Sequence, residues 1–320
     1  MKGRILTSLL AVIAITGLQA QETPAVPRLV VGLTIDQLNM DYVEAFADMF
    51  GERGFKRLWR EGRVYRNAEY NFNQVDRSSA VAAIYTGTTP HVNGIVGNAW
   101  MDRTSLQVVN CVDDTRFMGI YTSESTSPSR LAVSNLSDEL IVATQGTAEV
   151  YSIAPTREMA VLAAGHASQG AFWINDETGK WSGSTYYGTF PSWVSNYNDR
   201  QGLDFRISDM TWSPYLPVSI YRYLTSETKQ VTFKHKFNDE RKNKYRKLKT
   251  SPYANEEVNR LVNACLSSTS VGRDLVPDML NLAYYAGNYD HRPISELPME
   301  MQDTYVRLDA TLAELLEIID

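Results

Sequence analysis

Residues 28–36 read Arg-Leu-Val-Val-Gly-Leu-Thr-Ile-Asp, a short run of apolar, largely β-branched residues that ends at a carboxylate. Such a run predicts a central strand of a sheet that is covered on both faces. Further elements are expected as helices over residues 40–50, 54–61, 136–143 and 303–319, and as strands over 150–154, 160–163 and 171–174. This alternation predicts an α/β fold with a doubly wound, mostly parallel sheet, in which ligands bind beyond the carboxyl ends of the strands. Asp36 lies at such an end.

The composition is that of a globular protein. The chain has 320 residues, of which 43% are hydrophobic and 21% are charged, and its net charge is −6. These values exclude intrinsic disorder, and the acidic balance gives the chain as a whole no attraction for nucleic acid or an anionic membrane. Two cysteines are too few for a disulfide scaffold, and Cys111 and Cys265 either pair with each other or remain buried thiols.

The N-terminus has the features of a secretory signal peptide. Lys2 and Arg4 precede an apolar stretch over residues 5–17, and Ala20 ends a segment suited to cleavage. We therefore expect residues 1–20 to be removed and residues 21–320 to form a periplasmic or secreted protein. No cysteine follows the apolar stretch and no later apolar run is long enough to span a bilayer, so no membrane anchor is expected.

The most informative segment is residues 73–100, NQVDRSSAVAAIYTGTTPHVNGIVGNAW. It resembles the nucleophile-helix region of the alkaline phosphatase superfamily, in the branch of type I phosphodiesterases, nucleotide pyrophosphatases and related periplasmic phosphomonoesterases. Strings that support the resemblance occur in family order at residues 33–37, 54–58, 111–114, 164–166 and 303–309. The resemblance implies an alkaline-phosphatase-like domain over residues 21–320, with a cap-like insertion at about 170–250. A later metal-binding motif of the family would follow Asp320, so the domain is expected to be incomplete at its C-terminus.

Enzymes of this family hold two zinc ions and attack phosphorus with a threonine or serine. The resemblance assigns Asp36 to a metal-ligand position and Asn98 to an amide that contacts a phosphoryl oxygen, although Asn98 could instead only satisfy the backbone of a turn. Arg77 falls on the nucleophile position, and its permanently protonated guanidinium cannot attack phosphorus. Ser78 and Ser79 are poor substitutes, because one step along a helix turns a side chain by roughly 100°.

Two residues that grip phosphate are also replaced. Where this branch carries lysine and arginine, the chain has Thr156 and Glu158, and a carboxylate there would repel a phosphate dianion. A buried Asp36 without a metal needs a partner. Our hypothesis is that Arg77 supplies it, with Glu158 as a second carboxylate that could share Arg77.

The second metal motif is degenerate as well. Asn288 and Arg292 stand where the family has a metal-binding aspartate and histidine, and Arg292 is expected to bring a second cation to the site. Asp290 and His291 could form an offset metal site, but only if the loop were rearranged.

Two clusters have a structural interpretation that we prefer to a functional one. Trp173, Trp181, Tyr186, Tyr187 and Trp193 are expected to pack in the core and its loops rather than to stack a sugar or a base. A group of basic residues is interleaved with acidic and amide side chains and predicts a solvated insertion rather than a polyanion site: Lys234, Lys236, Arg241, Lys242, Lys244, Arg246, Lys247 and Lys249.

The sequence therefore predicts an exported pseudophosphatase that binds a small phosphorylated ligand or a periplasmic protein, without nucleic acid and without a cofactor. The alternative is an active metal-dependent phosphomonoesterase or phosphodiesterase that uses zinc.

Overall fold

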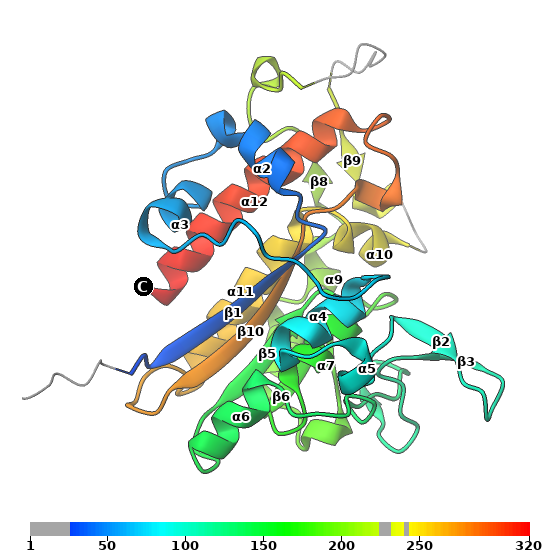
Figure 1. Ribbon diagram of the computed structural model, residues 1–320. Helices are drawn as coiled ribbons and strands as arrows, with labels where there is room; N and C mark the ends of the chain where they lie inside the picture. Colours follow the sequence, from blue (N-terminus) through cyan, green and yellow to red (C-terminus); the bar gives the residue numbers. More distant parts are fainter. Residues whose placement is uncertain (1–25, 224–231, 240–242) are drawn as a thin grey trace, which may run out of the picture.

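The computed structural model describes residues 26–223, 232–239 and 243–320 (Figure 1). The predicted signal peptide lies outside these residues. A six-stranded sheet forms the centre, in the order β1 (Leu29–Asp36), β10 (Asp278–Tyr285), β5 (Val150–Ala154), β6 (Gly170–Ile174), β7 (Trp181–Ser184) and β4 (Gly119–Ile120). The first four strands of this order are mutually parallel, while β7 and β4 are antiparallel to their neighbours. The predicted mostly parallel sheet is confirmed.

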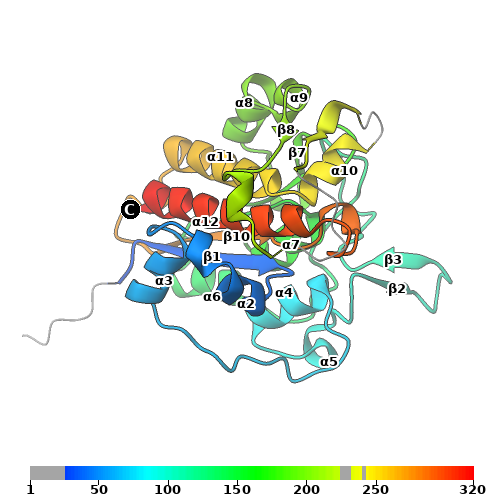
Figure 2. The same cartoon turned by 90° about the horizontal axis from the view of Figure 1, so that it is seen from above.

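Helices cover both faces of the sheet, as Figure 2 shows along its edge. One face packs against α8 (Ser192–Arg200), α11 (Tyr253–Ser268) and α12 (Pro298–Ile319), and the other against α4 (Arg77–Thr86), α6 (Leu136–Ala143) and α7 (Arg157–Ala164). Side chains of β10 alternate between these layers: Leu280 and Leu282 join the first core, and Met279 and Ala283 join the second. This alternation is what a strand buried on both faces requires.

The remaining elements lie outside these layers. The expected helix over residues 40–50 is divided at Phe46 into α2 (Met40–Ala45) and η1 (Ala47–Met49), and it is followed by α3 (Phe55–Glu61). The others are α5 (Pro90–Asn93), β2 (Ala99–Met101), β3 (Val108–Asn110), η2 (Thr185–Tyr187), α9 (Leu203–Arg206), β8 (Thr211–Trp212), η3 (Val218–Ile220), β9 (His235–Lys236), η4 (Phe237–Asp239), α10 (Lys244–Lys249) and η5 (Tyr289–His291).

One predicted strand is wrong. Residues 160–163 belong to the helix α7, whose side chains from Met159 to Ala164 are all buried. A helix buried on every side has no polar face, so its short apolar run shows no period and cannot be distinguished from a strand by pattern. Alanine, leucine and methionine favour the helix, and Thr156 occupies its N-cap position.

The segment expected to form a cap begins inside the sheet, because β6 and β7 occupy residues 170–184. The chain between β7 and β10 packs over the α11 side (Figure 2) and includes α8, α9 and α10. Whether it acts as a separate cap stays a prediction. At the other end of the sheet, β1 is an edge strand among the described residues, and each of its residues is partly exposed. The prediction that residues 28–36 form a central strand is therefore wrong for the described sheet.

The cysteines and the aromatic residues lie in the cores. Cys111 and Cys265 are free, buried thiols in different clusters, one on each face of the sheet. Trp173, Trp181 and Trp193 are buried, as expected for core residues. Within the described residues, no helix is long and apolar enough to cross a membrane.

Candidate functional site

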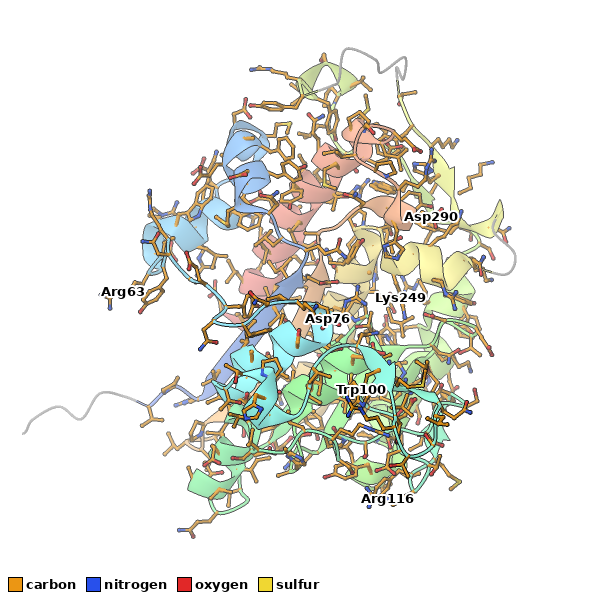
Figure 3. All side chains as sticks on the ribbon, turned by 45° about the vertical axis from the view of Figure 1, so that its right-hand side comes forward. Arg63, Asp76, Trp100, Arg116, Lys249 and Asp290 are labelled. Carbon is orange, nitrogen blue, oxygen red and sulfur yellow. The ribbon has the colours of Figure 1, made fainter. Side chains whose placement is uncertain are left out.

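The carboxyl ends of β1, β10, β5 and β6 open on a cavity of about 240 Å³. The residues that line it include Asp36 at the end of β1, Arg77 at the start of α4, Thr156, Arg157 and Glu158 at the start of α7, and Lys249 at the end of α10. In Figure 3, Asp76 at the start of α4 and Lys249 lie on the same side of the molecule. The cavity therefore occupies the place where parallel α/β sheets bind ligands.

Arg77 is paired with Asp36. Its Nε and Nη2 atoms both lie 2.7 Å from Oδ2 of Asp36, whose side chain is 11% exposed. Asp36 is on the α4 face of the sheet because alternate residues of β1, such as Leu33 and Ile35, face the opposite core. The hypothesis that Arg77 supplies the partner of Asp36 is confirmed.

The first turn of α4 is tightly fixed. Asp76 caps the helix by accepting from the Ser79 N–H at 2.9 Å, and its second oxygen accepts from the Asn98 N–H at 2.6 Å. A cation such as Arg77 is unfavourable at the positive end of a helix. The nearby carboxylates of Asp36 and Asp76 compensate for this charge.

Neither serine hydroxyl faces the cavity, since the cavity lining includes neither Ser78 nor Ser79. The Ser78 hydroxyl donates to Oδ1 of Asn98 at 2.7 Å and accepts from the thiol of Cys111 at 3.4 Å. The Ser79 hydroxyl donates to Oδ1 of Asp76 at 2.9 Å and accepts from the Asp76 N–H at 3.0 Å, which completes the capping box. Both hydroxyls are used in the local structure of α4.

The bond from Ser78 orients the amide of Asn98. Because Oδ1 of Asn98 accepts from Ser78, the Nδ2 group is left as the donor that this cavity-lining side chain can offer to a ligand. Burial raises the pKa of the Cys111 thiol to about 12, so the thiol stays protonated and can donate to Ser78. Cys111, Ser78 and Asn98 thus form a chain of hydrogen bonds that ends at the cavity.

Thr156 and Glu158 lie at the start of a helix rather than in a strand. Glu158 accepts from Nδ2 of Asn110 at 2.7 Å, and among the described residues it makes no ion pair with Arg77. The suggestion that Glu158 shares Arg77 is therefore wrong. Between them, Arg157 is buried and donates to Oδ1 of Asp113 at 2.9 Å.

Fewer residues around η5 line the cavity than the sequence predicts. Arg292 lies at the surface, where its guanidinium pairs with Glu296 at 2.6 Å, so it brings no second cation to the cavity. Asn288 accepts through its backbone oxygen from Tyr285, and Asp290 pairs with Lys247 at 3.1 Å. In Figure 3, Asp290 lies above Lys249. Of the four η5 candidates, only His291 lines the cavity.

The opposite wall comes from the basic segment that we expected to be solvated. Lys249 is 13% exposed; its ammonium lies 2.5 Å from Oδ1 of Asp176 and donates to the backbone oxygen of Ile174 at 3.3 Å. Arg246 also pairs with Asp176. The expectation of a fully solvated segment is wrong for Lys249, and Arg241 and Lys242 lie outside the described residues. Sequence reasoning also missed Arg157 and Asp176, although both follow shortly after a strand of the parallel sheet.

The donor set beside Asp36 does not fit the zinc ions that the family resemblance implies. Arg77 has no lone pair to offer a metal and carries a fixed positive charge 2.7 Å from the carboxylate. A divalent cation at Asp36 would be repelled by this guanidinium and would have to displace it. We therefore derive no chemical step through zinc from these residues.

Comparison with known proteins identifies the family. The model of the family described as type I phosphodiesterase / nucleotide pyrophosphatase matches residues 30–320. The chain is 31% identical to the alkaline phosphatase PhoV of Synechococcus elongatus, over 93% of this chain and 57% of that protein. It is also 31% identical to the alkaline phosphatase PafA of Elizabethkingia meningoseptica, over 98% of this chain and 60% of that protein.

Solved structures agree with this relationship. The crystal structure of wild-type PafA superposes with a TM-score of 0.83 at 28% identity, covering 92% of this chain and 59% of PafA. A substituted variant of PafA gives a TM-score of 0.84. The chain thus spans somewhat less than two thirds of the length of these relatives. It belongs to the type I phosphodiesterase/nucleotide pyrophosphatase family, within the alkaline phosphatase superfamily.

Proposed function

We propose that the cavity binds a small phosphate ester without hydrolysing it. The observation that carries this proposal is the Arg77–Asp36 pair, which puts a guanidinium at the first position of α4, bonded to the first-strand carboxylate. A guanidinium cannot serve as a nucleophile at neutral pH, and it occupies the carboxylate that would otherwise hold a metal. The same group is well suited to binding phosphoryl oxygens.

The spacing of PafA residues supports the assignment of Arg77. The substituted PafA variant carries changes at a threonine, an asparagine, a lysine and an arginine. The first two lie as far apart in PafA as Arg77 and Asn98 do here. On this correspondence, Asn98 is retained and the threonine is replaced by Arg77.

Several donors remain for a phosphate ligand. Asp36 engages two of the five N–H groups of Arg77, and Asn98 offers its Nδ2 group. The N-terminus of α4 adds its partial positive charge. Hydrogen bonds from charged donors to phosphoryl oxygens are the stronger kind, so Arg77 and Asn98 form the expected anchor.

Hydrolysis is the second candidate, and the comparisons favour it, because PhoV and PafA are named alkaline phosphatases. In this proposal the whole protein is a zinc-dependent phosphomonoesterase or phosphodiesterase. The nucleophile would be a displaced serine, and further metal ligands would come from polypeptide beyond this chain. The placement of the Ser78 and Ser79 hydroxyls is the observation against it.

An assay of the full-length protein with zinc separates the two candidates. The substrates are para-nitrophenyl phosphate and bis(para-nitrophenyl) phosphate, and the matched variants are Ser78→Ala, Ser79→Ala and Arg77→Ala. We expect no turnover above a blank prepared from a mock purification, together with binding of methyl phosphate that Arg77→Ala abolishes. Zinc-dependent hydrolysis that Ser78→Ala or Ser79→Ala removes would overturn our proposal in favour of the enzyme.

Export is part of the same proposal. A cleaved signal peptide would place the protein in the periplasm or outside the cell, where the ligand is a small phosphorylated molecule and the alternative partner is a periplasmic protein. N-terminal sequencing of the protein isolated from its native host tests this, since a mature start near Gln21 is expected.

A further inference from the structure

Three buried hydrogen-bond donors in one wall of the cavity have no acceptor among the described residues. They are the hydroxyl of Thr156, Nε of Arg157 and the indole Nε1 of Trp173. All three residues line the cavity, and Arg157 and Trp173 are 8% and 1% exposed. Buried donors without acceptors are costly and rare, so a group of them at a cavity indicates a place where a ligand supplies the acceptors.

The sheet brings these donors together. Ala154, the last residue of β5, pairs directly with Trp173 of β6 in the parallel register, and Thr156 and Arg157 follow Ala154 after a single residue. The three donors thus come from the carboxyl ends of two neighbouring strands. Arg77 and Asn98 line the same cavity from α4 and the loop before β2.

The charge around this wall excludes a second anion. Three carboxylates approach the Arg157 guanidinium. Asp113 lies 2.9 Å from Nη2, whereas Glu124 and Glu158 lie 3.7 Å and 4.0 Å from Nε, beyond hydrogen-bond distance. They outnumber the single positive charge, so a phosphate or carboxylate of the ligand would be repelled here. An ammonium group would be attracted, but it has no lone pair with which to accept from the three donors.

A hydroxyl group meets both requirements, because it accepts from N–H and O–H donors and donates to carboxylates. We propose that this wall, formed by Thr156, Arg157 and Trp173, is a subsite for the uncharged polyol part of a phosphorylated ligand, such as the ring of a sugar phosphate or an inositol phosphate. This inference rests on the proposed binding of phosphate at Arg77 and Asn98, and it names the class of molecule to which that phosphate is attached.

Calorimetric titration of the full-length protein tests the subsite. The probes are a hexose monophosphate, inositol monophosphate, methyl phosphate, phosphoethanolamine, a hexose bisphosphate and free inositol. We expect the two polyol monophosphates to bind about 10-fold or more tighter than methyl phosphate, since two or more hydrogen bonds are added. The polyol monophosphates should also bind tighter than phosphoethanolamine and the bisphosphate.

Substitutions that each remove one donor test which side chains form the polyol subsite. Trp173→Phe and Thr156→Val each remove one donor and keep most of the side-chain volume, so each should weaken binding of the hexose monophosphate by about 2- to 10-fold and leave methyl phosphate binding unchanged. Neither should lower Tm, because the removed group has no partner to lose in the free protein. The matched controls are Trp193→Phe and Ser168→Ala, which change buried residues outside the cavity and should leave binding of both ligands unchanged.

The outcomes separate the two proposals. Equal affinity for hexose monophosphate and methyl phosphate, or an equal loss for both ligands in Trp173→Phe, would refute the polyol subsite while leaving phosphate binding intact. Tighter binding of phosphoethanolamine or of the bisphosphate would refute it as well, because either would show that the wall takes a charged group. Binding of free inositol without any binding of methyl phosphate would support the subsite and refute the proposed phosphate anchor.

Discussion

Replacing Arg77 by methionine tests the ion pair on which the proposed function depends. The change keeps the aliphatic part of the side chain and removes the guanidinium, which leaves the carboxylate of Asp36, only 11% exposed, without either of its two 2.7 Å contacts. A hydrogen bond to a charged group contributes about 1.5–3 kcal/mol to stability when buried. Arg77 is 26% exposed, so solvent screening reduces this figure, and we expect Arg77→Met to cost about 1–2 kcal/mol.

The measurement is a double-mutant cycle with Arg77→Met, Asp36→Asn and the double variant. Thermal unfolding should show Tm lowered by about 1–4 °C in Arg77→Met, with partial recovery in the double variant because the unpaired charge is gone. The coupling free energy of the cycle should be at least about 1 kcal/mol.

Arg57→Met is the matched control. Arg57 is 27% exposed, almost the same as Arg77, but its partners Glu61 and Asp320 are 52% and 56% exposed. Exposed pairs of this kind contribute little to stability, and added salt should weaken them more than it weakens the Arg77 pair. A coupling free energy near zero, or equal losses in Arg77→Met and Arg57→Met, would show that the pair does not hold the site together.

Three further predictions concern other parts of the structure. Ser78→Ala should weaken binding of methyl phosphate by about 2- to 10-fold although Ser78 does not line the cavity, because the Asn98 amide loses its fixed orientation; unchanged affinity in titration would contradict this positioning role. The buried thiol of Cys111, whose pKa is raised to about 12 by desolvation, should resist iodoacetamide at pH 8 until denaturant is added, as mass spectrometry can show. The hydrogen bond that His166 donates to Asp138 raises the pKa of His166, so this pair stabilises the fold below the ordinary histidine pKa and its contribution is lost as the pH rises through the raised value. Chemical unfolding of His166→Gln and the parent protein should therefore give free energies of unfolding that differ by less than about 1 kcal/mol for this half-buried pair, and the difference should shrink from pH 6 to pH 9. A difference that stays constant over this pH range would refute the prediction.

Local sequence predicted those parts of the site in which neighbouring residues decide the structure. Most of the run Leu29–Asp36 is apolar because β1 lies in a sheet with helices on both faces, and the sheet directs Asp36 toward α4. Asp76 and Ser79 form a capping box, a local feature that fixes the start of α4 and with it the position of Arg77, although sequence reasoning had not identified it. The Arg77–Asp36 pair could therefore be foreseen from charge compensation in a site that the resemblance had already located.

Residues that are distant in the sequence could not be placed in this way. Arg292 was expected at the site, but in the structure a glutamate four residues later holds it at the surface. Lys249 belongs to a basic segment that reads as solvated, yet Asp176, which follows β6, draws it into the cavity wall. In both cases a local pattern gives the charge of the side chain, while its direction depends on which partner the fold brings near.

By itself, the sequence determined the family and the parallel α/β sheet, and it led to the proposal that Arg77 stands at the nucleophile position, because each depends on residue identity and on order along the chain. Only the tertiary structure decided that the Ser78 hydroxyl is bonded to Asn98, that α7 is a helix, and that Thr156, Arg157 and Trp173 present unpaired donors at one cavity. The physical reason is that the whole fold determines which buried donors find acceptors. Whether a donor has an acceptor depends on neighbours supplied by other strands and helices, and no window of sequence contains them.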